Sequence, residues 1–290
     1  MKKQSVVTTL LLSAMAMANS SYSQQSTLPL TGPYLGQKSP GAVPQVFAPG
    51  TVSSAGWETG GVFSPDLKEF YFIRKNQESN QQEIVVIENE GSRWNESVFS
   101  PRTGTPLFSP DGNTMHLGTR YRTRTADGWS EMAELDPPLN NYPIMRLTAS
   151  SEKTYFFDEF KQDLTGDIRY SKIVDGKHQA PQLLGSHINS GKSFHPFVAP
   201  DESYLIFDSK RSGGYGDSDL YISYKLKNGS WSNPINLGEK INTEGWEAVA
   251  SVTSDGKYMI FNRNPTPGNH ENVDIFWVNA DFIQSLRPKP

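Results

Sequence analysis

The sequence contains no cysteine, no run of basic residues, and no long apolar segment beyond its N-terminus. Without cysteine there is no disulfide scaffold, no Cys-ligated zinc or iron–sulfur site, no thiol nucleophile and no lipid anchor on an N-terminal cysteine. With 27 Lys and Arg against 31 Asp and Glu, the formal charge is −4, which argues against nucleic acid as a partner. We expect no membrane span, because no later segment is long and apolar enough.

The N-terminus has the pattern of a secretory signal peptide. Two lysines precede a short apolar stretch at 6–18, and a small, polar stretch follows at 19–25. The alternative is a membrane anchor, for which the apolar stretch is too short. We therefore expect a periplasmic or secreted monomer. The predicted organisation is a signal peptide (1–23), an N-terminal extension (24–42) and a single folded domain (43–290).

Turn formers and aromatic residues are abundant, with 24 Gly, 20 Pro, 15 Phe, 12 Tyr and 6 Trp. This composition favours many short strands over helical bundles. The strongest signal is a repeat in which a short strand enters a tight turn and an aromatic strand follows, as in Val62-Phe63-Ser64-Pro65-Asp66 before Phe70-Tyr71-Phe72. The five turns begin at Ser64, Ser109, Ala149, Ala199 and Thr253.

The chemistry of the turn explains the repeat. Proline presets φ, aspartate can bond the backbone that follows it, and glycine tolerates positive φ. The turns recur at intervals of about 40 to 54 residues, and each interval has room for about four strands, which is the size of one propeller blade. The sequence therefore predicts an all-β fold, a β-propeller of five four-stranded blades.

The last blade lacks its fourth strand at the C-terminus. A matching segment, Val43–Phe47, occurs near the N-terminus instead. We predict that this segment pairs with the strand at Asp274–Val278 and closes the ring, because closure removes the free sheet edges.

The Ser-Pro-Asp-Gly turns resemble those of the TolB-type, WD-like β-propeller repeat family. The resemblance covers about residues 43–286, although the turns at Ala149 and Thr253 depart from the motif. It implies a propeller whose first strands line a central channel, and it says little about function. A ligand site is expected at a mouth of that channel.

Position in the repeat selects the candidate site residues. Glu58, Glu247 and His195 lie at starts of first strands, on one face, and are the candidate catalytic residues. Arg146 is assigned to the opposite strand face unless the third blade is misaligned by one residue. The candidate substrate-binding cations are Arg146 and four residues assigned to the ends of second strands, Arg74, Arg120, Lys210 and Arg263.

Each candidate also has a structural interpretation. Glu58 and Glu247 share a repeated Gly-Trp-Glu, so they could accept loop N–H bonds instead. His195 could be a satisfied channel histidine, and the arginines could pair with neighbouring acids. His116 is predicted to be a core residue, and the repeated Trp94, Trp129 and Trp231 to be packing elements.

Several chemistries have no support in the sequence. There is no Gly-x-Ser-x-Gly, Walker, dinucleotide-binding or His-Glu-x-x-His motif. His195 alone does not make a multi-histidine metal cluster. We predict no metal and no cofactor.

Two functions remain open. The first is an exported propeller that acts on an acidic, uronate-containing oligosaccharide, as a lyase or dehydratase working by β-elimination, with His195 as base and Glu58 or Glu247 as acid. Glycoside hydrolysis by the two glutamates is a variant of it. The second is a non-catalytic propeller, like TolB, that binds a periplasmic protein or a glycan.

Overall fold

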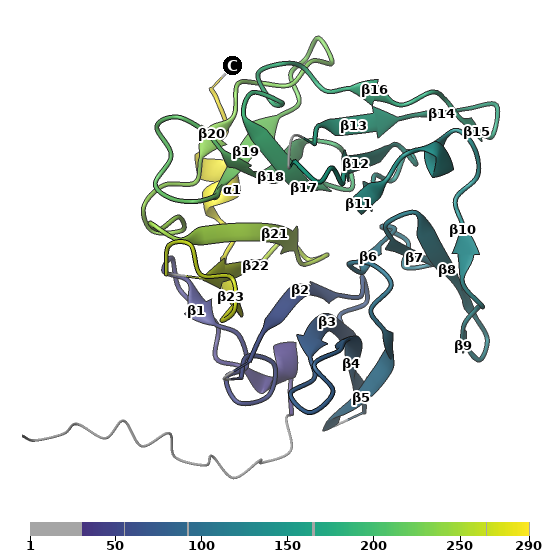
Figure 1. Cartoon of the computed structure of the whole chain (residues 1–290), viewed down its shortest axis with the longest axis vertical. Coiled ribbons are helices and arrows are strands. Elements are labelled where there is room, and N and C mark those ends of the chain that lie inside the picture. The colour runs from purple at the N-terminus through teal and green to yellow at the C-terminus, as the bar shows by residue number, and fades with distance from the viewer. Residues whose placement is uncertain (1–30, 55, 92, 164–165, 265, 290) are drawn as a thin grey trace, which may run out of the picture.

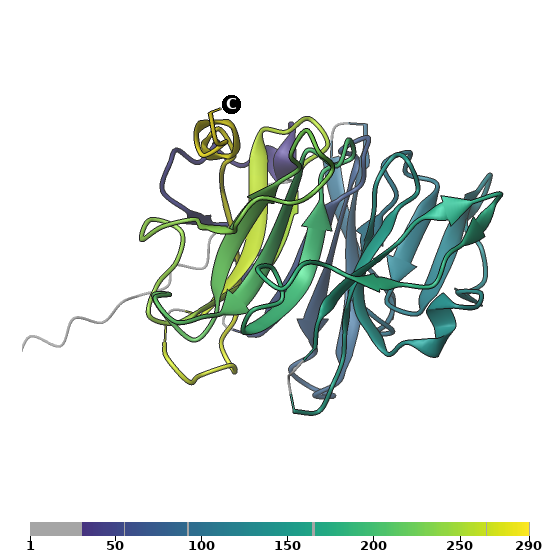
Figure 2. The ribbon, with the colours of Figure 1, turned by 90° about the horizontal axis from the view of Figure 1, so that it is seen from above.

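The computed structural model describes residues 31–54, 56–91, 93–163, 166–264 and 266–289. They form a ring of five antiparallel sheets, seen along its axis in Figure 1, and each sheet has four main strands. Figure 2, turned by 90°, shows the strands crossing the thickness of the ring obliquely. The predicted five-bladed β-propeller is thus confirmed. The predicted signal peptide lies outside the described residues.

In each blade the first strand is nearest the axis and the fourth is outermost (Figure 1). Blade 1 contains β2 (Glu58–Phe63), β3 (Glu69–Lys75), β4 (Gln82–Glu90) and β5 (Arg93–Pro101). Blade 2 contains β6 (Leu107–Phe108), β7 (Thr114–Leu117), β8 (Arg120–Thr125) and β10 (Ala133–Glu134), with β9 (Gly128–Trp129) paired to β8. Blade 3 contains β11 (Ile144–Ala149), β12 (Tyr155–Glu159), β13 (Ile168–Ser171) and β16 (Gln182–Leu183), with the hairpin β14 (Ile173–Val174) and β15 (Lys177–His178) beside it.

Blade 4 contains β17 (Lys192–Val198), β18 (Tyr204–Lys210), β19 (Asp219–Tyr224) and β20 (Ile235–Asn236). Blade 5 contains β21 (Trp246–Val252), β22 (Tyr258–Asn264), β23 (Asp274–Asn279) and, from the other end of the chain, β1 (Gln45–Val46). The described helices are the 3-10 turns η1 (Tyr34–Gly36) and η2 (Leu139–Asn141) and the short α1 (Phe282–Ser285). Among the described residues, no helix combines the length and apolar character needed to cross a membrane.

The ring closes as the sequence predicts. β1 pairs antiparallel with β23, with Gln45 opposite Trp277 and Val46 opposite Phe276. The next residue continues the contact, since the Phe47 backbone N–H donates to the Ile275 carbonyl at 2.8 Å. The two ends of the chain therefore share one sheet, and the last blade is complete.

Part of the predicted N-terminal extension packs into the core. Tyr34 and Leu35 are buried in a cluster with Phe63, Tyr258 and Trp277, at the seam between blades 1 and 5. The Tyr34 ring lies edge-on to the Tyr258 ring, with centroids 4.8 Å apart. Figure 2 shows η1 and α1 on the same side of the ring. This segment thus adds to the closure made by β1.

The repeated turns are held by the side chains that the motif supplies. The Ser64 hydroxyl donates to Asp66 at 2.6 Å and accepts the Glu69 N–H at 2.9 Å. The turns at Ser109 and Thr253 make the same two contacts. Threonine therefore replaces serine without loss in the fifth copy, where the sequence departs from the motif.

His116, on β7, is buried as predicted, and its burial makes the folding stability sensitive to acid. Neither ring nitrogen has a hydrogen-bond partner among the described residues. Burial, with a smaller contribution from the charge of His178, lowers the pKa of His116 from 6.5 to about 4. The unfolded chain therefore takes up this proton first as the pH falls below 6.5. We expect this residue to remove about 2 kcal/mol of folding stability between pH 7 and pH 5.

The measurement is urea unfolding of the wild type and of His116→Leu at both pH values. The variant should be less sensitive to acid by that amount, and more stable at pH 7 because an unpartnered polar group is removed. His270→Gln, at an exposed position, is the matched control. An equal loss of stability in the wild type and in His116→Leu would contradict this assignment.

Candidate functional site

Three of the first strands carry a β-bulge whose central residue has positive φ. These residues are Gly60, His195 and Val249, with φ of 69°, 49° and 57°. In each case, a second-strand side chain of the preceding blade accepts the backbone N–H of the bulge. The pairs are Asn262 with Gly60 at 3.2 Å, Asp158 with His195 at 2.9 Å, and Asp208 with Val249 at 3.1 Å. Two buried aspartates are thereby fixed beside the axis.

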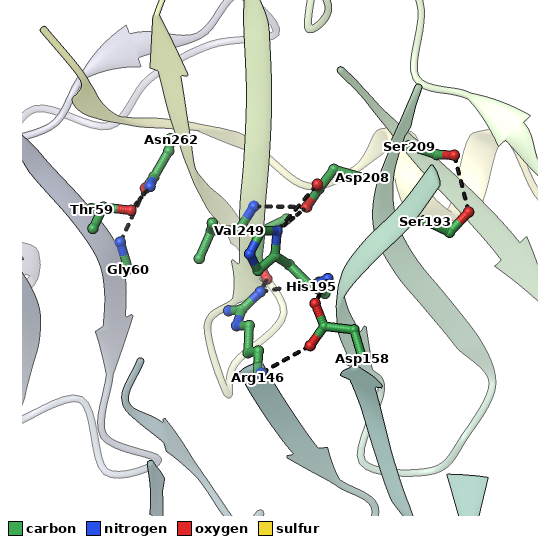
Figure 3. Close-up of polar contacts among 11 residues, drawn as sticks. Thr59, Gly60, Arg146, Asp158, Ser193, His195, Asp208, Ser209, Val249 and Asn262 are labelled. Atoms are coloured by element: carbon green, nitrogen blue, oxygen red, sulfur yellow. Dashed lines mark hydrogen bonds and ion pairs between the residues drawn. The ribbon is translucent and has the colours of Figure 1, made fainter. Parts of the chain in front are cut away.

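Asp208 also binds the His195 ring. The His195 Nδ1 lies 2.9 Å from Asp208 Oδ1 and 3.1 Å from Oδ2, and the two side chains are 15% and 2% exposed. Figure 3 shows this pair beside Val249, with Arg146 and Asp158 below it. With Nδ1–H donated to the carboxylate, a neutral ring carries its lone pair on Nε2, which makes no hydrogen bond to any described residue. The arrangement is that of a histidine base oriented by an acid.

The environment favours the protonated form of His195. Burial lowers the pKa of His195, and the charge of Arg146 lowers it further. The charge and hydrogen bond of Asp208, with the charge of Asp158, outweigh these effects and raise the pKa above 6.5. For Asp158, burial raises the pKa, although the charge of His195 and the hydrogen bond from its backbone N–H lower it. The proton on His195 is therefore bound more tightly than on a free imidazole.

Arg146, on β11, points toward His195 from the neighbouring blade (Figure 3). It is 0% exposed, and its Nη1 donates to the carbonyls of Ala250 at 2.9 Å and His195 at 3.2 Å. Its Nε has no partner, and no described carboxylate lies within 4.0 Å of the guanidinium. Burial lowers the pKa of Arg146 to about 10, against the charges of Asp158 and Asp208, so the group stays cationic at neutral pH.

The position of Arg146 corrects the strand-face assignment made from the sequence. The register of β11 shifts between Ile144 and Leu147, so a bulge interrupts the alternation of faces. The Arg146 side chain consequently lies on the side of the axis together with His195. The sequence analysis allowed for a one-residue misalignment in this blade, and the bulge is its physical cause.

Glu58 and Glu247 are both fully buried and both hold a loop. Glu58 accepts the hydroxyl and N–H of Ser54 at 2.5 and 3.3 Å, and Glu247 accepts those of Thr243 at 2.7 and 2.8 Å. Burial raises the pKa of both, against these hydrogen bonds. The contacts agree with the structural interpretation of the repeated Gly-Trp-Glu. Neither carboxyl contacts His195.

The remaining candidate cations pair with nearby acids and do not join His195. Arg120 begins β8 and does not end the second strand, as the sequence suggested, because β7 stops at Leu117 and a tight hairpin follows. The pairs are Arg74 with Glu83 at 3.0 Å and with Glu96 at 2.7 Å, Arg120 with Glu134 at 3.9 Å, Lys210 with Asp217 at 3.5 Å, and Arg263 with Glu247 at 3.0 Å.

The axial cluster is therefore Arg146, Asp158, His195 and Asp208. Asp158 lies near the end of β12 and Asp208 near the end of β18, and neither is among the candidate residues selected from the sequence. The available signal is periodic, since Asp158, Asp208 and Asn262 each lie nine residues after the start of their turn. In the part of the chain that the structure describes, no three His, Asp or Glu side chains are grouped to hold a metal ion.

No family model matches the sequence, and no curated protein matches it. Among solved structures, a putative TolB from Agrobacterium tumefaciens is 16% identical with a TM-score of 0.48, and the match covers 79% of each chain. An endo-arabinase from Bacteroides thetaiotaomicron is 14% identical with a TM-score of 0.48, over 82% of this chain and 96% of that one. An α-L-arabinofuranosidase from Podospora anserina, solved with cellotriose, is 9% identical with a TM-score of 0.44, over 86% and 93%.

These similarities are too distant to bear on what this chain binds. The propeller assignment rests on the sheet topology of the chain itself. Because no family model matches, membership of the TolB-type repeat family stays a prediction.

Proposed function

We propose that this chain is an exported, glycan-processing propeller that binds an acidic oligosaccharide at the axial cluster and cleaves it by β-elimination. The observation that carries the proposal is the orientation of His195. Its Nδ1 is held by Asp208 at 2.9 Å, the ring is partly exposed, and Nε2 has no partner among the residues that the structure describes. A histidine held in this way is suited to take a proton from a bound substrate.

The proposed step removes the proton on the carbon beside the uronate carboxylate. His195 Nε2 takes the proton, its electron pair forms a carbon–carbon double bond, and the glycosidic carbon–oxygen bond breaks. The leaving oxygen takes its proton from solvent, because Glu58 and Glu247 are buried and bound to loops. The products are an unsaturated uronate and a free sugar end.

Arg146 supports this reaction without touching the substrate. Its side chain is fully covered, so it does not act as the substrate-binding cation that the sequence predicted. Its positive charge lies close to His195, whose carbonyl it binds, and no described carboxylate forms an ion pair with it. A buried cation acts at low dielectric, so it stabilises negative charge that develops in the channel.

The pH dependence should follow His195. Proton acceptance needs the neutral ring, and the neighbouring acids raise the pKa of His195, so kcat/KM should rise with pH through a pKa above 6.5. Asp208→Asn keeps an acceptor for the Val249 N–H but removes the charge. Its profile should therefore rise at lower pH than that of the wild type. If the rise of kcat/KM in Asp208→Asn occurred at the same pH as in the wild type, or at a higher pH, another group would be responsible for it.

A binding role without catalysis is the second candidate. The axial cluster holds two cations and two anions when His195 is protonated, so its charges compensate each other without a ligand. Under this alternative a glycan or a protein contacts the channel and leaves unchanged. Calorimetric binding of a uronate oligosaccharide with no product formed would favour it.

The test of the proposal is a screen of the purified protein against uronate-containing oligosaccharides. Absorbance of the unsaturated uronate and the mass of each product are followed together. Elimination gives an absorbing fragment that is lighter than the hydrolytic product by one water. Hydrolytic fragments, or no turnover of any acidic glycan, would overturn the proposed chemistry.

A further inference from the structure

The three repeated tryptophans differ in how their indole N–H groups are satisfied. Trp94 donates to the Gly32 carbonyl at 2.8 Å, and Trp129 donates to the Tyr71 hydroxyl at 3.1 Å. The indole N–H of Trp231 donates to no described residue, although Trp231 packs edge-on against Phe156, with centroids 5.9 Å apart. One of three equivalent packing residues thus keeps a free donor.

The cause lies in a single repeat position. Tyr71 and Phe156 both lie seven residues after the start of their turn, so they are equivalent in blades 1 and 3. Tyrosine supplies the hydroxyl that Trp129 binds, and phenylalanine supplies none to Trp231. The Trp231 N–H is not among the buried polar groups that lack a partner, so it is accessible to solvent or to a ligand.

A cavity of about 220 Å³ opens at this point between blades 3 and 4. Its walls include the rings of Phe156, Tyr170 and Trp231, and its polar lining includes Lys172, His187 and the ion pair of Lys225 with Glu202 at 2.9 Å. Trp94, by contrast, belongs to a buried cluster that includes the N-terminal Tyr34 and Leu35. A cation lies over each of the other two rings, since the Arg124 guanidinium is 3.9 Å from the Trp129 centroid and the Lys225 ammonium is 4.9 Å from the Trp231 centroid.

We propose that this cavity binds one sugar ring of a glycan, at a site separate from the axial cluster. Pockets for drug-sized ligands hold about 300–1,000 Å³, so a cavity of about 220 Å³ suits a single ring. A sugar ring offers an apolar C–H face to aromatic walls and hydroxyl oxygens to the free indole N–H. The ammonium of Lys172, which makes no ion pair with the described residues, suits a carboxylate on that ring.

This inference extends the proposed function, since both concern an acidic glycan, and the experiment separates the two. His195→Gln protein, labelled with ¹⁵N, is titrated with a trimer of galacturonic acid, so that no substrate is consumed. The readout is the indole N–H resonance of Trp231, which is assigned by its absence from Trp231→Phe. This resonance should shift and saturate, while those of Trp94 and Trp129 stay in place.

Phe156→Tyr is the decisive variant. The new hydroxyl would accept the Trp231 N–H as Tyr71 accepts that of Trp129, and it would compete with the ligand without opening a cavity in the core. We expect the dissociation constant of the galacturonate trimer, read from the Trp231 resonance, to be at least 10-fold higher in this variant. Tyr71→Phe, made at the equivalent position of blade 1, is the matched control and should bind normally.

Two results would overturn the inference. One is a Trp231 resonance that does not move at any ligand concentration. The other is a Phe156→Tyr variant that binds as tightly as its parent. Elimination by the wild-type protein together with either of these results would leave the proposed function intact and refute only the second site.

Discussion

Phe47→Ala is expected to destabilise the protein by about 3–5 kcal/mol, the cost of deleting a fully buried aromatic side chain. Phe47 is 0% exposed and follows the closing strand β1. Its ring centroid lies 4.8 Å from that of Phe70 and 5.1 Å from that of Trp277, so it joins the first and last blades. Truncation therefore removes packing at the seam where the two ends of the chain meet.

The measurement is equilibrium unfolding in urea, followed by tryptophan fluorescence and by circular dichroism. Val43→Ala, at a position that is 62% exposed, is the control and should change stability by less than about 0.5 kcal/mol. A loss below about 1 kcal/mol in Phe47→Ala would mean that the ring does not depend on this closure.

The fold was predictable because its information is local and repeated. The turn at Ser64 carries its own hydrogen-bonding groups, and so do those at Ser109 and Thr253, so each copy reports the same hairpin. Ring closure was predictable because a strand missing at one end of the chain is present at the other. The cost of an open sheet edge makes their pairing the natural solution.

The site was less predictable because it depends on departures from strand regularity. Position counting assumes strict alternation of faces, and the bulge in β11 breaks that alternation before Arg146. Equivalent bulges at His195 and Val249 create N–H groups that Asp158 and Asp208 bind from other blades. Such contacts join residues far apart in sequence, and their only signal in the sequence is the recurrence of Asp158, Asp208 and Asn262 at one repeat position.

Repetition was informative about Glu58 and Glu247. A feature that recurs in two blades most simply serves the blade, and both carboxylates accept hydrogen bonds from their own preceding loops. For Trp231, repetition was less informative, because its repeat position predicts a packing role alone. Phe156 lacks the hydroxyl that Tyr71 provides, and this single difference leaves the Trp231 indole N–H without a partner among the described residues.

His195→Gln is the substitution with the largest expected effect on activity. Glutamine has similar length and can still donate an amide hydrogen to Asp208, so the cluster should remain assembled. It cannot take a proton at neutral pH, and loss of a positioned general base costs about 100- to 10,000-fold in rate. The exposed His270, whose ring lies edge-on 5.9 Å from that of Trp246, provides the matched control His270→Gln.

The most direct measurement is the rate of unsaturated-uronate formation by the wild type, His195→Gln and His270→Gln at equal concentration and with matched thermal unfolding curves. The proposed function predicts turnover by the wild type and His270→Gln, and at least a 100-fold loss in His195→Gln. A rate for His195→Gln within about threefold of the wild type would contradict the role of His195 as the base.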